Sequence, residues 1–343
     1  MTTHANTLFV QTQGAYLGQD GETVRVKIEG QVKLTVPLHH LEGIVCFGRV
    51  TVSPSLIAKC SELGLSIAHF TEHGRFVARM QGPISGNVLL RREQYRRADD
   101  PTACLKVARS VVAAKIQNSR TTLLRAARET DDSAKAEQLG RVAQRLANTL
   151  DDVAKANSVD AARGYEGDAA RVYFDHFNLL IRQQADAFQM TTRSRRPPLD
   201  PLNALLSFVY AILTNDMVSA LEGVGLDPAV GFLHVDRPGR PSLALDLVEE
   251  FRTLVGDRLV VSLINLKQVQ ADGFETQPGG AVVMNEATRR TVLTALTQRK
   301  REEVTHPLLG DKLTIGLLPH VQARLLARYL RGDIADYPPL VLK

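Results

Sequence analysis

The chain has 343 residues, which is room for two domains or one large one and for a core that needs no disulfides. Hydrophobic residues make up 44% and charged residues 23%, values that exclude a wholly disordered chain. Lysine and arginine total 42 against 37 acidic residues, for a formal net charge of +5. This balance permits binding to nucleic acid without showing it.

Cysteine spacing and the N-terminus bear on the compartment. Cys46, Cys60 and Cys104 are far apart and form no C-x-x-C pair, which favours a reducing environment. The first nine residues lack the charged start and apolar run of a secretory signal, and we identify no apolar run long enough to cross a membrane. We therefore expect a cytoplasmic protein with no membrane partner.

Residues 1–82 are predicted to form a small N-terminal β domain. Alternation of apolar and polar residues predicts a hairpin with one solvated face, and a short apolar run predicts a strand buried on both sides. A short helix is expected to begin at Pro54, with Ser53 as its N-cap. The strands are expected at 24–28, 32–36, 44–47, 65–70 and 75–80.

After an expected linker over 83–100, the hydrophobic period changes to that of helices. Residues 101–343 are therefore predicted to form a large, mainly α-helical domain, which makes the fold class α+β with two domains. A turn at 278–280 predicts a small β-hairpin between 274 and 284. Helices are expected at 102–128, 134–154, 160–188, 200–222, 242–255, 257–269, 285–303 and 317–331.

One acid lies on the apolar face of the helix predicted over 160–188. Glu166 shares a stripe with Tyr173 and Phe177, so its carboxylate points inward. A buried carboxylate implies a cation, a metal ion or a cleft beside it. The alternative is an ordinary acid near a helix N-terminus, partly exposed and stabilised by the helix dipole.

A histidine and a pair of acids add to this first acid. His234 lies in the Gly- and Pro-rich segment 231–240, which is typical of a fixed loop, although an ordinary hydrogen-bonded histidine is the alternative. Asp246 and Glu249 share an edge of the next predicted helix, where a solvated acidic face is the alternative. Together with Glu166 these side chains would suit Mg²⁺ or Mn²⁺ better than zinc. Spacing alone leaves open whether they meet.

Three ordered blocks of sequence resemble the CRISPR-associated adaptation integrases, the metal-dependent DNases that are the first of the numbered Cas proteins. The blocks are Gly164-Tyr165-Glu166-Gly167 with Tyr173-Phe174, then Arg195-Arg196-Pro197-Pro198 with Asp200-Pro201 and Asn203 to Phe208, and finally His234 with Arg237, Asp246-Leu247, Glu249, Phe251 and Arg252. The overall look of the chain favours a type I system.

This resemblance implies a function, a site and partners. The N-terminal domain would be β-sandwich-like and used in dimerisation, and the helical domain would be catalytic. Glu166, His234 and Glu249 would be the catalytic and metal-binding residues, with Asp246 as a supporting acid. The cofactor would be Mg²⁺ or Mn²⁺. The partners would be double-stranded DNA, as fragments and as the CRISPR repeat, a second copy of the chain, and the small second CRISPR-associated adaptation protein.

The implied reaction is insertion of short DNA fragments into the CRISPR array by attack of a 3′-hydroxyl on a phosphodiester. A divalent ion would lower the pKa of that hydroxyl and neutralise charge on the phosphate. Such a reaction needs no Ser, Cys or Tyr nucleophile, and the sequence has no recognisable triad motif. Protonation of His234 would compete with the metal, so activity is expected to fall on acidification.

Basic residues could hold the DNA backbone. Residues 86–131 include ten Lys or Arg against five acids, and Arg193, Arg195 and Arg196 form a tight group. Arg237 and Arg240 flank His234 and are expected to contact phosphate near the metal. The alternative is that many of these side chains only solvate the surface.

Two other functions stay open at this point. One is a metal-dependent DNA-repair nuclease that cuts branched DNA without joining it. The other is a helical DNA-binding scaffold without catalysis, for which substitution of Glu166 or His234 would leave turnover unchanged.

Overall fold

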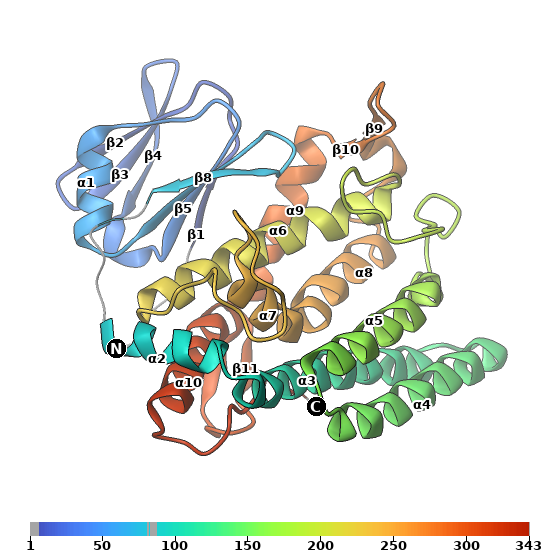
Figure 1. The fold of residues 1–343 in the computed structure, drawn as a ribbon. Coiled ribbons are helices and arrows are strands. Elements are labelled where there is room, and N and C mark those ends of the chain that lie inside the picture. The colour runs from blue at the N-terminus through green and yellow to red at the C-terminus, as the bar shows by residue number, and fades with distance from the viewer. Residues whose placement is uncertain (1–6, 81, 83–87, 343) are drawn as a thin grey trace.

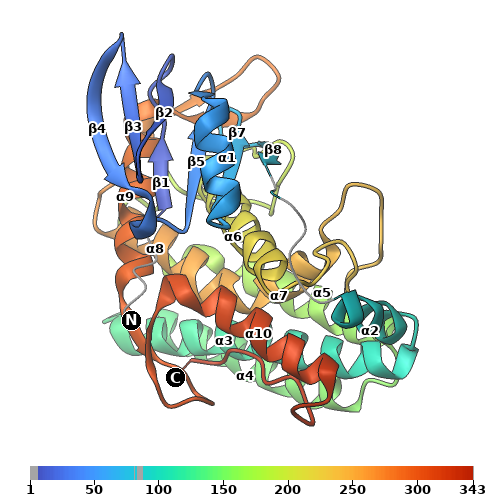
Figure 2. The ribbon, with the colours of Figure 1, turned by 90° about the vertical axis from the view of Figure 1, so that its left-hand side faces the viewer.

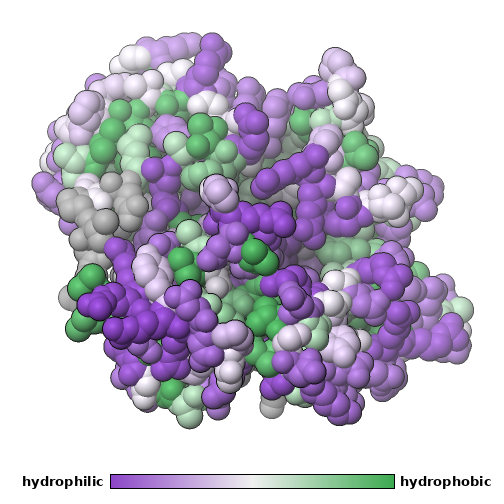
Figure 3. All heavy atoms as spheres, viewed as in Figure 1, coloured by the Kyte–Doolittle hydropathy of each residue, from purple (hydrophilic) through white to green (hydrophobic). Residues whose placement is uncertain are grey.

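The structure is a computed structural model, and it describes residues 7–80, 82 and 88–342. A strand-rich N-terminal domain packs on one side of a larger helical body, which confirms the predicted α+β class (Figure 1, Figure 2). Polar residues cover most of the face seen in Figure 3.

The β domain consists of two four-stranded sheets and one helix. One sheet has the order β1-β5-β7-β8 and the other β4-β3-β2-β6. The bounds are β1 Thr7–Val10, β2 Tyr16–Asp20, β3 Thr23–Ile28, β4 Gln31–Pro37, β5 Gly43–Phe47, β6 Thr51–Val52, α1 Pro54–Glu62, β7 Ser66–Phe70 and β8 Phe76–Met80. The predicted hairpin is confirmed as β3 and β4, and the hydroxyl of Ser53 accepts the Leu56 N–H at 3.2 Å as an N-cap.

Strand β5 is buried on both sides, as predicted, because it separates two cores. Ile44 and Cys46 face the core of the β domain, whereas Val45 and Phe47 face the core shared with the helices. The ring of Phe47 lies 5.6 Å from that of Phe208, which comes from the helical body. Alternate side chains of one strand therefore join the two domains.

The helical body is built around α3 and α6. Its helices are α2 Val88–Ala98, α3 Pro101–Glu129, α4 Ser133–Lys155, α5 Val159–Asp175, α6 Pro201–Gly223, α7 Ser242–Phe251, α8 Arg258–Asn265, α9 Glu286–Arg301 and α10 Leu318–Arg331. Two short hairpins, β9 Phe274–Thr276 with β10 Val282–Met284 and β11 Glu303–Thr305 with β12 Lys312–Thr314, lie between them. By length and composition, helix α6 is long and apolar enough to cross a membrane, which we did not expect. However, 72% of its apolar 18-residue stretch is buried inside the protein.

Three predicted boundaries differ from the structure. The helix expected over 160–188 ends at Asp175, because the Asn178 side chain pairs with the Met190 backbone and folds the following segment back. The helix expected over 242–255 changes to a π-helical turn at Arg252–Asp257. Helix α2 occupies most of the expected linker over 83–100, of which residues 83–87 lie outside the described residues.

Helix α2 forms because it is held by long-range bonds. The buried Gln94 side chain donates to the carbonyls of Asp227 and Val230 at 2.8 and 2.9 Å. The guanidinium of Arg97 lies over the ring of Tyr329 at 5.1 Å. Neither contact leaves a periodic signal in the local sequence.

Substitution of Phe208 by alanine tests the junction between the domains. Phe208 is buried against Phe47 and against Gly74, whose φ of +86° and position leave no room for a side chain. We expect Phe208→Ala to lower the free energy of unfolding by about 3–5 kcal/mol, as measured by urea denaturation. The control Leu266→Ala removes an exposed side chain and should cost less than about 0.5 kcal/mol. Equal losses in both variants would contradict this packing.

Candidate functional site

Lys115 brings two of the predicted site residues together. Its ammonium, at the centre of α3, contacts Glu166 Oε1 on α5 and lies 2.7 Å from Glu249 Oε2 on α7. Arg252 Nη2 lies 3.1 Å from the other oxygen of Glu249. The side chain of Glu249 is 4% exposed and that of Glu166 is 21% exposed, so Glu166 lies at the rim.

These charges stabilise one another inside the protein. Burial opposes ionisation of Glu249, but Arg252 and Lys115 outweigh it and lower the pKa of this carboxyl. Burial likewise opposes protonation of Lys115, but Glu249 and Glu166 outweigh it and raise the pKa of the ammonium. Both groups are therefore charged at neutral pH.

His234 is placed by Asp246, in the middle of α7. The buried carboxylate of Asp246 accepts the backbone N–H groups of Phe232, Leu233 and His234 at 2.6, 2.9 and 2.9 Å. Its Oδ1 also lies 2.7 Å from His234 Nδ1. When Nδ1 donates this bond, the lone pair of Nε2 is available to a ligand, an arrangement common to metal-binding histidines.

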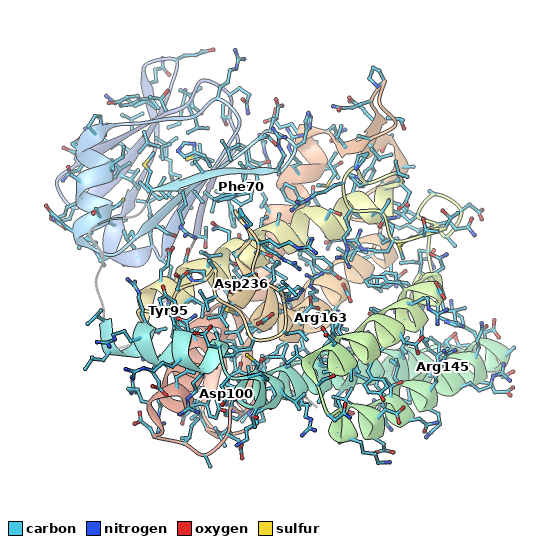
Figure 4. All side chains as sticks on the ribbon, viewed as in Figure 1. Phe70, Tyr95, Asp100, Arg145, Arg163 and Asp236 are labelled. Atoms are coloured by element: carbon cyan, nitrogen blue, oxygen red, sulfur yellow. The ribbon has the colours of Figure 1, made fainter. Side chains whose placement is uncertain are left out.

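The loop that carries His234 is also tied to α5. The guanidinium of Arg163 donates twice to the carbonyl of Leu233, at 2.7 and 3.1 Å. Figure 4 labels Arg163, on α5, and Asp236, on the loop, toward the middle of this face. Gly231 is required at the start of this loop, because a Cβ there would lie 2.9 Å from Asp246 and from the Ser242 backbone.

The carboxylate oxygens and the imidazole present are suitable ligands for a hard divalent cation, although they do not surround a single point. Within residues 7–80, 82 and 88–342, no three His, Cys, Asp or Glu side chains converge closely enough to hold a metal. The structure instead forms two pairs, Glu166 with Glu249 through Lys115 and His234 with Asp246. The buried Oε2 of Glu249 has no partner in the described part of the chain other than the ammonium of Lys115. Carboxylate oxygens and one imidazole are ligands that Mg²⁺ and Mn²⁺ accept.

The alternative of a solvated acidic face on α7 is wrong. Asp246, Glu249 and the neighbouring Glu250 are all buried. The carboxylate of Glu250 accepts the Tyr337 hydroxyl at 2.6 Å and the Leu340 N–H at 2.7 Å, and burial raises its pKa to about 7. Glu250 thus anchors the C-terminal segment and lies outside the candidate site.

The five arginines predicted to bind DNA fall into two groups. Arg193 is engaged inside the protein, because its Nη1 donates to Asn203 Oδ1 at 2.6 Å and to the Ser194 carbonyl at 2.7 Å. The side chains of the second group make no hydrogen bond or ion pair with the described residues. This group comprises Arg195, Arg196, Arg237 and Arg240.

Sequence reasoning did not single out Lys115 or the network beneath it. A lone lysine in the apolar run 111–116 is the signal that could have found it. Below it, a cavity of about 10 Å³, room for about one water molecule, is lined in part by Tyr173, Tyr210 and Asp257. Both tyrosines donate to Asp257, and burial raises the pKa of that carboxyl to about 6.

Removal of the buried ammonium tests this arrangement. We expect Lys115→Met to lower the free energy of unfolding by about 3–5 kcal/mol at pH 7, since it leaves two carboxylates without their shared cation. Because the fold lowers the pKa of Glu249, its ionised carboxylate stabilises the folded protein at pH values above about 4.3, the ordinary pKa of glutamate. This stabilisation is lost as the pH falls below that value. The difference between variant and wild type should therefore shrink below about pH 4.

The control is Lys106→Met, which removes an exposed lysine from the same helix. It should change the unfolding free energy by less than about 0.5 kcal/mol. A pH-independent loss in Lys115→Met, measured by denaturation between pH 3 and 8, would show that packing rather than charge is responsible.

The chain matches the family model described as CRISPR associated protein Cas1 over residues 8–298. It is 52% identical over 341 residues to the CRISPR-associated endonuclease Cas1 1 of Chlorobaculum tepidum, with 99% of each chain covered. It is 48% identical over 338 residues to the protein of the same name from Moorella thermoacetica, with 98% of each covered.

Solved structures share the fold. A Cas1 protein from Thermotoga maritima aligns with a TM-score of 0.82 and 23% identity over 95% of this chain and 97% of that one. A casposase bound to its integration product aligns with a TM-score of 0.81 and 21% identity over 97% of this chain and 93% of that one. The family match and the close relatives together show that the chain belongs to the Cas1 family of CRISPR-associated proteins.

Proposed function

We propose that this protein is a metal-dependent DNA integrase and endonuclease of CRISPR adaptation, which inserts short DNA fragments into the array by 3′-hydroxyl attack on a phosphodiester. The observation that carries the proposal is the pairing of Glu166 with Glu249 beside a histidine whose Nδ1 is held by Asp246. The names of the close relatives support the endonuclease, and the casposase, which shares the fold, supports the joining reaction.

Glu166, Glu249 and Nε2 of His234 would hold Mg²⁺ or Mn²⁺. The bound ion would supply Lewis-acid polarisation of the phosphate and a lower pKa for the attacking hydroxyl. To make room for the ion, the Lys115 ammonium would have to move away from the two carboxylates. In its new position it could contact a phosphate oxygen of the DNA. Arg237 and Arg240, whose side chains have no partner among the described residues, would bind the phosphates that flank the reacting one.

The proposed partners are double-stranded DNA, a second copy of the chain and the small second CRISPR-associated protein, within the cytoplasm of a type I system. A solved Cas6-RT-Cas1–Cas2 complex contains a chain that matches all of this one over 37% of its own length, with a TM-score of 0.82. For the homodimer, we assign the interface to residues 1–82, where Val32 and Leu34 on β4 are each 47% exposed. The catalytic domain would be residues 101–343.

The first test replaces each proposed ligand. Glu166→Ala, His234→Ala and Glu249→Ala are expected to reduce Mn²⁺-dependent joining of short duplexes to a repeat-bearing plasmid by more than about 100-fold, since loss of even an outer-shell partner costs about 10–100-fold. DNA affinity should stay close to wild type. The control Glu137→Ala removes an exposed acid from α4 and should keep full activity.

The products of the wild-type reaction decide among the candidate functions. Joined products support the integrase. Cleavage of branched DNA without joining would support the repair nuclease instead, and unchanged turnover in the three variants would support the scaffold.

A second test concerns the orientation of His234. Asp246→Asn removes the carboxylate that accepts Nδ1, so we expect Mn²⁺ affinity, measured by calorimetry, to fall about 10–100-fold. The matched control is Asp236→Asn, on the same loop but exposed. If both variants bind Mn²⁺ as the wild type does, His234 is not a ligand oriented by Asp246.

A further inference from the structure

A second basic site lies where the C-terminal half of α3 faces the start of α8. A cavity of about 480 Å³ there, which we name the α3–α8 cavity, is lined by Thr121, Thr122, Arg125, Arg128, Glu129 and Arg258. Its volume lies in the range of about 300–1,000 Å³ that is typical of ligand sites. None of these six residues belongs to the proposed catalytic set.

Arg258 is the unusual member of this cavity. It is half-buried, and its side chain makes no hydrogen bond or ion pair with the described residues. Burial lowers the pKa of its guanidinium, and the charges of Arg299 and Arg125 lower it further, while Glu302 and Glu129 oppose them more weakly. A half-buried cation whose strongest charged neighbours are cations is stabilised by a bound anion.

The one acid that lines the cavity is already shared. Glu129 Oε1 lies 2.6 Å from Arg125 Nε, and Glu129 Oε2 lies 3.8 Å from Arg182 Nη2. Arg128 has only the Leu124 carbonyl of its own helix, at 3.3 Å. Among the described residues, Arg128 and Arg258 are therefore left without a carboxylate, and the side chains that line the cavity carry net positive charge.

We propose that the α3–α8 cavity binds the phosphate backbone of DNA, through Arg128 and Arg258. Guanidinium groups match phosphate with paired N–H donors, and Arg125 adds a third positive charge at the wall. Ten residues of α3 separate Lys115 from Arg125, which is about 15 Å along the helix. The cavity therefore holds a phosphate remote from the reacting one. DNA as the ligand rests on the proposed function.

The experiment measures binding of a defined duplex DNA by fluorescence anisotropy over a range of salt concentrations. The test variant is Arg128→Gln/Arg258→Gln in the full chain. Its slope of log K against log salt should be smaller than that of the wild type by about 2, one for each lost phosphate contact. The control Arg141→Gln/Arg171→Gln removes the same charge from exposed positions on α4 and α5 and should keep the wild-type slope.

Two further measurements keep the result interpretable. Arg128→Gln alone changes an exposed side chain, so it should fold normally and lower the slope by about 1. Mn²⁺ affinity should be unchanged in all these variants, which separates failure of this site from failure of the proposed active site. The proposal is overturned if the test and control variants bind DNA alike, or if the test variant loses binding of inorganic pyrophosphate but keeps that of DNA.

Discussion

The buried ammonium of Lys115 is the interaction on which the candidate site depends. Helices α3, α5 and α7 each present one charged side chain to the same point, and two of the three are carboxylates. Burial alone would favour protonation of Glu249. Arg252 and Lys115 outweigh burial and lower the pKa of Glu249, so this carboxylate stays ionised inside the protein. Lys115 also contacts Glu166, so the contact that stabilises the packing holds the two side chains together where a stronger cation could bind.

The histidine side of the site is built in a different way. Helix packing places the two glutamates, whereas His234 is placed by a loop whose backbone N–H groups close on the carboxylate of Asp246. Asp246 and Glu249 lie one turn apart on α7, so this helix is common to both pairs. A displacement of α7 would therefore disturb the carboxylate pair and the imidazole together. The π-helical turn that follows at Arg252–Asp257 is the kind of irregularity that often accompanies a functional site.

Much of the fold could be predicted because it repeats a period. The hairpin of β3 and β4, the capped helix α1 and the long helices α3, α4 and α6 all show local patterns that tertiary contacts reinforce. The strands β1 and β6 are too short for a pattern, and the bonds of Asn178 and Gln94 that shape the segments after α5 and before α3 are invisible to any local window. For the site, the sequence suggested the acids and the histidine, but it could not predict Lys115 between them, because that contact joins residues far apart in the chain.

The candidate active site is rich in acidic side chains, whereas the α3–α8 cavity is basic. In the proposed function the first would carry out the reaction and the second would bind DNA. At the candidate active site the carboxyl groups of Glu166, Asp246 and Glu249 lie close to Lys115 and Arg252, and a reacting phosphate would have to approach these carboxyl groups. The α3–α8 cavity is positive whether or not a metal is present. If the protein acts as proposed, backbone affinity would come from arginines remote from the reaction, and a divalent cation would be needed only where the reacting phosphate approaches carboxylates. On this arrangement metal binding would change the rate of the reaction far more than the affinity for DNA.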